Sequence, residues 1–542
     1  MANVTDSASV LVVPSGWSDG VLGSLQPDDG SSDFTFSRGS DLSATRVNEQ
    51  GYIEKGYENL LLHSNTFDTT WTQVNVNPPV SGYEGYDGSN NAWLLQNNTN
   101  SGFVNQNISN NGISVFSAYA KAGNVNFIRV RADYSSIATT YFDLNPNTIG
   151  NRIGTQENNI DAYIEDVGNG WYKCSIVYNG TTTRVRLYPA ITDGDTLGLD
   201  NSIYIQDAML NQGLVAYPYI ETTTTTAKNA VILEDQPRID YTSGNGSVLI
   251  EPQRTNILSQ SEYLTGQKSV ITYNNQISPE GLENALKQTG DGSAPYFYID
   301  TRPTLPSSGT YNVSIFVKKG TTDWFRIRVR DLDTFYYANF NITSKVIGQH
   351  NSITTPQIVD YLNDWKRISM TFETTILLKA QFNIAPMDGD EDEQFTDTSL
   401  EYAYFYGLQC EKGSNTTSYV PTYGTSSTRV KDTATLTKNV AATGTIYINI
   451  NADSTKTLTF LGGNVSVTQG VNKIALAYSP TALKISHNGS IVQNIARAFD
   501  TSSLTEIQLG HRNNFEQTTD SINQFLTLDS FLTDTKLNEL TA

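Results

Sequence analysis

Apolar and polar residues alternate along most of the chain. Between Phe325 and Arg330, three apolar residues alternate with three arginines, so a strand there turns its apolar side chains to one face and its arginines to the other. Ser114–Ala120 and Tyr311–Val317 alternate in the same way. A sheet with one apolar face needs a second sheet to cover it. Many short strands separated by Gly, Asn, Asp and Pro turns therefore predict an all-β fold built from jelly-roll β-sandwiches.

Helical periodicity is confined to two short segments. Residues 280–286 and 533–540 carry apolar residues at helical spacing. In the second segment Leu537 and Leu540 would share one face, and Thr533 would be the N-cap. Helices are therefore expected to be a minor part of the fold.

The order of the predicted strands occurs twice. Asn59–Ser64 resembles Asn256–Ser261 at an offset of 197 residues. Later matches keep the same order: Lys121–Gly123 with Lys318–Gly320, Phe127–Arg131 with Phe325–Arg330, Gly170–Lys173 with Asp364–Arg367, Asp193–Asp195 with Asp388–Asp390, and the turn Tyr217-Pro218 with Tyr419–Pro421. Two domain-sized copies of one sandwich explain this order better than a short-period solenoid.

The duplication divides the chain into five predicted parts. They are an N-terminal anchor or assembly segment (1–57), a first jelly roll (58–226), linker strands (227–255), a second jelly roll (256–431) and a smaller C-terminal sandwich (432–542). The N-terminal segment could add strands to a neighbouring sheet edge.

Composition narrows the function. The 542 residues carry a formal net charge of −20, and only 17% are charged. An acidic chain repels phosphate backbones, so we expect no nucleic-acid partner. No apolar run is long enough to insert into a membrane. Cys174 and Cys410 lie far apart without a disulfide framework, so we expect buried thiols.

Four segments resemble a family of phage structural proteins: Pro14–Trp17, Asp33–Gly39, Ala44–Asn48 and Leu249–Asn256. Its members are similar to tail-fibre and other virion-surface proteins, with jelly rolls like carbohydrate-binding modules and a concanavalin A-like, laminin-G-like sandwich after them. The resemblance implies a virion location after synthesis in a host cytoplasm, which agrees with the lack of a signal peptide. It also implies virion proteins of the tail, baseplate or capsid as partners, a homo-oligomer, and contact with a host surface glycan.

Aromatic residues are the candidate glycan site. Pyranose rings stack on aromatic faces flanked by amides and carboxylates, so Trp71, Trp93, Trp324, Tyr336 and Tyr337 are candidate platforms. The alternative for each is core packing or a contact between subunits. Trp171 and Trp365 occupy matching repeat positions at the start of strands, which favours core packing for both.

An acidic loop is the candidate metal site. Residues 388–393 contain five carboxylates, and a Ca²⁺ site could draw oxygen ligands from Asp388, Asp390, Asp392 and Asp397. The segment is not an EF-hand loop. A solvated acidic loop without a metal is the favoured alternative.

Catalytic motifs are missing from the sequence. There is no nucleophile elbow, no His-Glu-x-x-His and no phosphate-binding Gly loop. The leading hypothesis is a non-enzymatic virion structural protein, a tail or head fibre that contacts host glycans. The alternatives are a capsid decoration protein without a receptor role and a polysaccharide-degrading tail spike.

Overall fold

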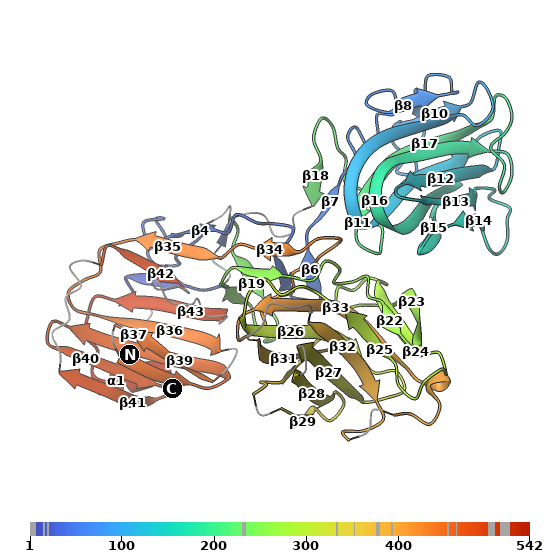
Figure 1. Cartoon of the computed structure of the whole chain (residues 1–542). Helices are drawn as coiled ribbons and strands as arrows, with labels where there is room; N and C mark the ends of the chain where they lie inside the picture. The colour runs from blue at the N-terminus through green and yellow to red at the C-terminus, as the bar shows by residue number, and fades with distance from the viewer. Residues whose placement is uncertain are drawn as a thin grey trace.

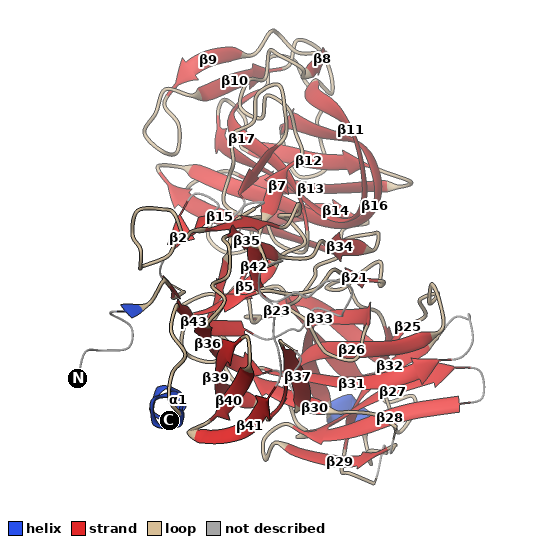
Figure 2. Ribbon diagram, turned by 90° about the vertical axis from the view of Figure 1, so that its left-hand side faces the viewer, coloured by secondary structure: helices blue, strands red, loops and turns tan. Residues whose placement is uncertain are grey.

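The chain folds almost entirely into β-strands. The computed structural model describes every residue except 1–6, 15–16, 19–20, 230–234, 332–333, 352, 375–379, 392–393, 453–454, 462, 497–503 and 510–520. The described strands form three modules, with the first jelly roll at one end of the molecule and the other two modules together (Figure 1, Figure 2). The all-β class and the tandem sandwiches predicted from the sequence are confirmed.

Two bent strands hold the first jelly roll together. β11 (Phe103–Ala122) and β16 (Trp171–Ala190) pair along most of their length, and each contributes to both layers. One layer also contains β14 (Ile153–Glu157), β13 (Ile137–Asp143), β12 (Phe127–Asp133) and β8 (Thr72–Val74). The other contains β15 (Asp161–Gly168), β17 (Ser202–Gln212), β10 (Ala92–Gln96) and β9 (Val80–Tyr83). The apolar core lies between the layers.

The second jelly roll repeats this strand order with shorter strands. One of its layers, called the outer layer here, contains β22 (Gly266–Gln267), β25 (Tyr298–Thr301), β32 (Gln381–Met387), β27 (Trp324–Asp331), β28 (Thr334–Asn341) and β29 (Val346–His350). The opposite layer is β23 (Ser269–Gln276), β24 (Ala285–Gly290), β33 (Tyr402–Lys412), β26 (Gly309–Lys318), β31 (Lys366–Thr374) and β30 (Gln357–Asp360), with the 3-10 helix η2 (Thr398–Leu400) nearby. In the second jelly roll, β25 and β26 together take the place of the long strand β11. In the same way, β31 and β32 together take the place of β16.

The repeat extends to individual hydrogen bonds. Asn59 Nδ2 donates to Ile220 O over 2.8 Å, and Asn256 Nδ2 donates to Val420 O over 2.9 Å. The hydroxyls of Ser64 and Tyr219 are 2.7 Å apart, as are those of Ser261 and Tyr419. The counterpart of Tyr419 is therefore Tyr219, and the sequence match with Tyr217 was wrong by two residues.

The third module takes strands from three parts of the chain. One sheet is β1 (Val10–Val12), β19 (Arg238–Asp240), β20 (Ser247–Leu249), β43 (Ser521–Leu528), β36 (Gly444–Ala452), β39 (Gly470–Ser479), β40 (Ala482–His487) and β41 (Ser490–Ala496). The other is β2 (Trp17–Ser18), β3 (Val21–Leu22), β4 (Phe34–Ser37), β35 (Thr433–Thr437) and β42 (Glu506–Leu509), and the hairpin of β37 (Lys456–Phe460) and β38 (Gly463–Val467) packs with them.

This arrangement corrects the predicted division of the chain. Residues 1–57 and 227–255 were expected to be an anchor and a linker, but β1, β4, β19 and β20 complete the C-terminal sandwich. Val10, Phe34 and Val248 lie in its core. Residues 432–542 alone give the second sheet two strands, β35 and β42, so the N-terminal strands supply the missing cover.

One of the two predicted helices is present. α1 (Asp534–Thr541) begins after Thr533, whose hydroxyl accepts from the amide of Lys536, and Leu537 packs on the outer face of β36 and β39. Residues 280–286 form a turn and the start of β24 instead, because Gly281 has φ +85° and its amide bonds Ser278 O. Among the described residues, no helix has the length and apolarity needed to cross a membrane.

Short hairpins and polar contacts join the modules. The hairpin of β5 (Thr45–Val47) and β6 (Ile53–Lys55) packs on the second jelly roll. Two-stranded ladders pair β7 (Tyr57–Asn59) with β18 (Ala227–Asn229), and β21 (Arg254–Asn256) with β34 (Ser427–Arg429). Between the jelly rolls, Asn274 Nδ2 donates to Asp161 Oδ2 over 2.8 Å. Cys174 and Cys410 are buried free thiols, as predicted.

Candidate functional site

Two of the predicted aromatic platforms lie in the core of the first jelly roll. Trp71 and Trp93 are 3% and 8% exposed, and both rings contact Phe67. Their indole nitrogens donate to His63 O and Asn65 O. Neither ring offers a face to a sugar in solution, so their assignment to a glycan platform is corrected to core packing. Trp171 and Trp365 are buried as expected.

The predicted aromatics of the second jelly roll separate by strand alternation. Phe325, Ile327 and Val329 are fully buried, so Trp324 and the arginines of β27 face outward. On β28, Tyr337 faces outward while Tyr336 points into the core, is 8% exposed and donates its hydroxyl to Glu373 O. Tyr336 is therefore a core residue, which corrects its place among the glycan candidates.

We call the outward side of this sheet the second-unit face. It is defined by Trp324, Arg326 and Arg328 of β27, Phe335, Tyr337 and Asn339 of β28, Asn383 of β32 and Asp300 of β25. The Phe335 side chain is 47% exposed, while Trp324 and Tyr337 are partly exposed. Two of the five predicted platforms thus lie together on one sheet, beside an aromatic residue that the sequence reasoning missed.

Hydrogen bonds hold the polar side chains of the second-unit face in place. Arg326 Nε donates to Asn339 Oδ1 over 2.7 Å, and its guanidinium carbon lies 5.2 Å from the centre of the Tyr337 ring. Arg328 donates to Asn383 Oδ1, and Asn383 Nδ2 donates to Asp300 Oδ1 over 3.0 Å. Partial burial lowers the pKa of Arg326. The buried amides of Asn339 and Asn383 thus hold the guanidinium groups in place. The aromatic rings and guanidinium groups form a pre-organised array that can stack on a sugar and bond its hydroxyls.

The first jelly roll has an equivalent surface, which we call the first-unit face. It contains Arg129, Arg131 and Asp133 of β12, Tyr141 of β13, and Arg184, Arg186 and Tyr188 of β16. The sheet registers match Arg129 with Arg326 and Arg131 with Arg328. The matched arginine runs of the two repeats are the sequence signal for these two faces. They do not show that β16 adds Arg184 and Arg186 to the first-unit face, because that depends on strand pairing.

The acidic loop uses its described carboxylates within the fold. Asp390 Oδ1 accepts from the Gln349 amide over 2.7 Å and from Asn339 Nδ2 over 3.0 Å. Asp397 is the N-cap of η2 and accepts from Ser399. Asp388 is exposed, and Asp392 lies outside the described residues. Within the described part, no three His, Cys, Asp or Glu side chains gather at a metal-binding distance, so the Ca²⁺ site remains a prediction.

A second aromatic surface was missed. On the other sheet of the first jelly roll, Tyr83, Tyr86, Tyr204 and Tyr219 are partly exposed around buried Trp171 and Tyr119. Tyr86 stacks on Tyr119 with ring centres 3.8 Å apart. The matching surface of the second jelly roll, around Trp365 and Phe316, is covered by Val47 and Ile53 of the β5–β6 hairpin. The duplication thus produced one covered copy and one open copy of the same surface.

Two of the segments that carry the family resemblance contribute to a buried ion network, Arg38 from Asp33–Gly39 and Glu251 from Leu249–Asn256. Arg38, Arg238, Arg429, Glu251 and Asp432 are all almost fully buried. Arg238 Nη2 lies 2.8 Å from Glu251 Oε2 and also pairs with Asp432. Burial raises the pKa of Glu251, but Arg429 and Arg238 outweigh burial and bring it to about 2. Buried charges persist only when they are paired, so these motif residues hold the modules together.

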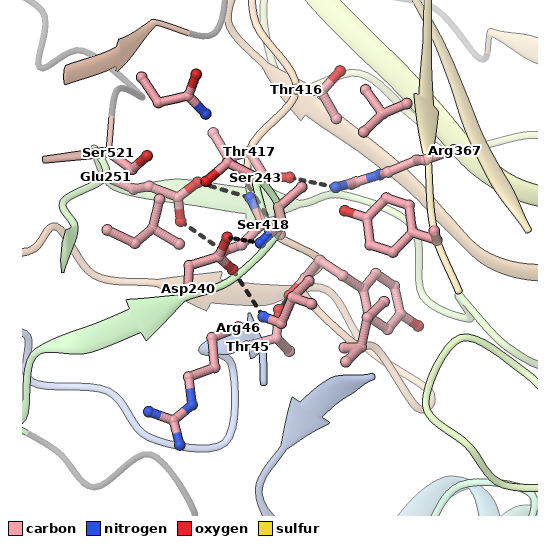
Figure 3. Close-up of a pocket in the computed structure, with 18 of the residues that line it drawn as sticks. Thr45, Arg46, Asp240, Ser243, Glu251, Arg367, Thr416, Thr417, Ser418 and Ser521 are labelled. Carbon is pink, nitrogen blue, oxygen red and sulfur yellow. Dashed lines mark hydrogen bonds between the residues drawn. The ribbon is translucent and has the colours of Figure 1, made fainter. Parts of the chain in front are cut away.

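A cavity of about 420 Å³ lies where the second jelly roll, the third module and the β5–β6 hairpin meet (Figure 3). Its walls include Asp240, Glu251, Arg367, Ser418 and Tyr361. Burial raises the pKa of Asp240, whereas that of Glu251 is low. Two neighbouring carboxylates with pKa values shifted in opposite directions are typical of catalytic acid and base pairs. Here, however, Asp240 accepts from the amides of Val47 and Thr242, and Glu251 is bonded to arginines and Ser418, so both carboxylates serve the junction.

Comparison with known proteins does not identify a family or a function for this chain. No protein-family model matches the chain, and no curated protein matches it. Among solved structures the chain is similar to the tandem CBM22-1 and CBM22-2 domains of Xyn10C from Paenibacillus barcinonensis, with 13% identity over 67% of this chain and 100% of that one. The TM-score of that superposition is 0.19, which supports no conclusion about fold or function. The fold rests on the sheet topology.

Proposed function

We propose that this chain is a non-enzymatic structural protein of a phage surface, such as a tail or head fibre, that contacts glycans. The observation that carries the glycan contact is the second-unit face, where Trp324, Phe335 and Tyr337 lie on the same solvent-facing sheet as Arg326. The virion location is supported by the resemblance of the sequence segments that build the ion network.

The chemistry of the second-unit face suits weak, rigid recognition. Phe335 and Tyr337 are two residues apart on β28, so their rings lie about 7 Å apart along the strand. Successive sugars of an extended glycan could stack on such a row, while the partly exposed guanidinium groups of Arg326 and Arg328 bond hydroxyls. Side chains already held by hydrogen bonds lose little entropy when a ligand binds. Several copies of the chain on one particle would then raise the avidity.

A binding measurement on the whole chain tests this proposal. Tyr337→Ala removes one stacking ring, and we expect glycan binding on an array and by calorimetry to weaken about tenfold, which corresponds to about 1.4 kcal/mol. Tyr402→Ala is the matched control, because Tyr402 is a partly exposed tyrosine on the opposite sheet of the same jelly roll. Equal binding by both variants and the unchanged protein would contradict the assignment of the glycan site.

The alternatives predict different outcomes in the same experiment. A capsid decoration protein without a receptor role would bind no glycan on the array. A polysaccharide-degrading spike would release reducing sugar from a bound polymer. Electron microscopy of intact particles labelled against this chain would place it on the tail, the baseplate or the capsid, and particles without the label would contradict a virion role.

A further inference from the structure

The first-unit face of this acidic protein holds several arginines around one carboxylate. Arg131 Nε, Arg184 Nε and Arg186 Nη2 all bond Asp133, at 2.7, 2.9 and 2.6 Å. Their side chains are 17%, 38% and 12% exposed, so these charges are partly removed from water. Burial raises the pKa of Asp133, but hydrogen bonds from Arg131 and Arg184 outweigh burial and keep it below its usual value. One carboxylate therefore faces three guanidinium groups.

A fourth arginine lies beside this cluster. Arg129 donates to Thr139 Oγ1, and its guanidinium carbon is 5.4 Å and 5.2 Å from the ring centres of Tyr141 and Tyr188. Within the described residues, no carboxylate forms an ion pair with Arg129. Asp143 at the sheet edge is bonded to its own turn. The four arginines thus lie close together around Asp133, while Asp143 and Glu157 lie toward the edge of the same face.

The three guanidinium groups around Asp133 carry more hydrogen-bond donors than one carboxylate can satisfy. Partly desolvated like charges repel one another more strongly than charges in water. The buried Nε of Arg186 also lacks a hydrogen-bond partner in the described structure. Guanidinium groups bind carboxylates and sulfates through paired hydrogen bonds, and the rings of Tyr141, Tyr188 and Phe103 keep these groups in fixed positions.

We infer that the first-unit face binds the anionic groups of an acidic polysaccharide. The inference rests on the proposed glycan contact and names a substrate class for it. Arg184, the most exposed of the three arginines around Asp133, would meet the anion first, and Arg129 and Arg131 would bind the same or the next anionic group along the polymer. The matching Arg326 and Arg328 of the second-unit face would extend the contact to a second module.

Three polymers test the inference: polygalacturonate, dextran sulfate and neutral dextran. The whole chain is expected to bind the two acidic polymers, to leave neutral dextran unbound at the first-unit face, and to lose affinity as NaCl rises, because salt screens exposed charges. Arg184→Gln should weaken binding to the acidic polymers about tenfold, the effect of losing one charge-assisted hydrogen bond. Lys228→Gln removes the same charge from an exposed site elsewhere and should have little effect.

Each outcome decides the inference. Preference for polygalacturonate identifies carboxylates as the ligand groups, and preference for dextran sulfate identifies sulfates. Equal binding of neutral dextran, no binding of either acidic polymer, or unchanged affinity in Arg184→Gln with an unaltered melting temperature overturns it. If Tyr337→Ala abolishes glycan binding while Arg184→Gln does not, the inference fails and the proposed function stands. If only Arg184→Gln acts, the glycan site lies on the first-unit face instead.

Discussion

At the scale of single residues, alternation predicts which way a side chain points but not what lies over it. Phe325 and Arg326 lie on opposite faces as the sequence indicated, because a strand has no other choice. Trp71 and Trp93 were misassigned because the strands that complete their core, such as β11 and β16, come from distant pairing. The tyrosines around Trp171 were missed for the same reason, since the two copies differ only in what packs on them.

Asp207, next to that tyrosine surface, gives a prediction for pH. Burial raises its pKa to about 7 from an ordinary value of 3.8, and it accepts a hydrogen bond from Tyr86. Because the folded protein binds this proton more tightly than the unfolded chain, stability should fall as pH rises from about 4 to 7. The Asp207→Asn variant has no proton to lose at this position, so its stability should not show this fall. The melting temperature of the variant should therefore rise relative to that of the unchanged protein as pH increases from 4 to 8.

Calorimetry at several pH values measures the effect. Asp68→Asn, at an exposed position of the same jelly roll, is the control and should follow the unchanged protein at every pH. Parallel curves for Asp207→Asn and the unchanged protein would show that Asp207 titrates near its ordinary pKa.

At the scale of elements, the duplication and most strands could be predicted, but the pairing of distant strands could not. The repeated Asn and Ser residues at the start of each jelly roll occupy equivalent hydrogen-bonded positions. The N-terminal strands, in contrast, look like independent short strands in the sequence, and nothing local indicates that β1 pairs with β43, more than 500 residues later. The candidate anchor was misplaced for this reason.

Removing the N-terminal strands should therefore unfold one module. Deletion of residues 1–37 removes β1 and β4, whose Val10, Phe34 and Phe36 are buried in the third module. We expect the C-terminal sandwich to lose its cooperative unfolding transition and to become sensitive to protease while both jelly rolls stay folded. Calorimetry and limited proteolysis measure this, and a folded sandwich in the deletion variant would refute the shared-sheet assignment.

At the scale of the whole molecule, the modules meet through close backbone contacts. Gly112 of β11 has φ +103°, and a Cβ there would lie 1.5 Å from Tyr423 O of the second jelly roll. Gln212 and Gln260 add hydrogen bonds across the same contact. The angle between the jelly rolls, and with it the direction of both arginine-bearing faces, thus depends on one small residue.

Gly112→Ala should separate the two jelly rolls. Backbone strain at a positive φ costs about 1–2 kcal/mol, and the clash adds to this cost, so we expect a lower melting temperature and a larger radius of gyration by small-angle scattering. Gly88→Ala is the control, because Gly88 has φ +76° but nothing within 4 Å of the added Cβ. An unchanged radius of gyration in Gly112→Ala would refute a rigid contact.

The pairing of β1 with β43 also has a consequence for synthesis. A ribosome releases the chain from its N-terminus, and domains usually fold as they emerge. Both jelly rolls can fold this way, because each is built from one continuous stretch. β1 and β20, in contrast, cannot pair with β43 until that strand emerges, and β4 must wait for β35. Closing the third module therefore follows the folding of both jelly rolls, and we expect it to act as a check that assembly begins only with chains translated through β43.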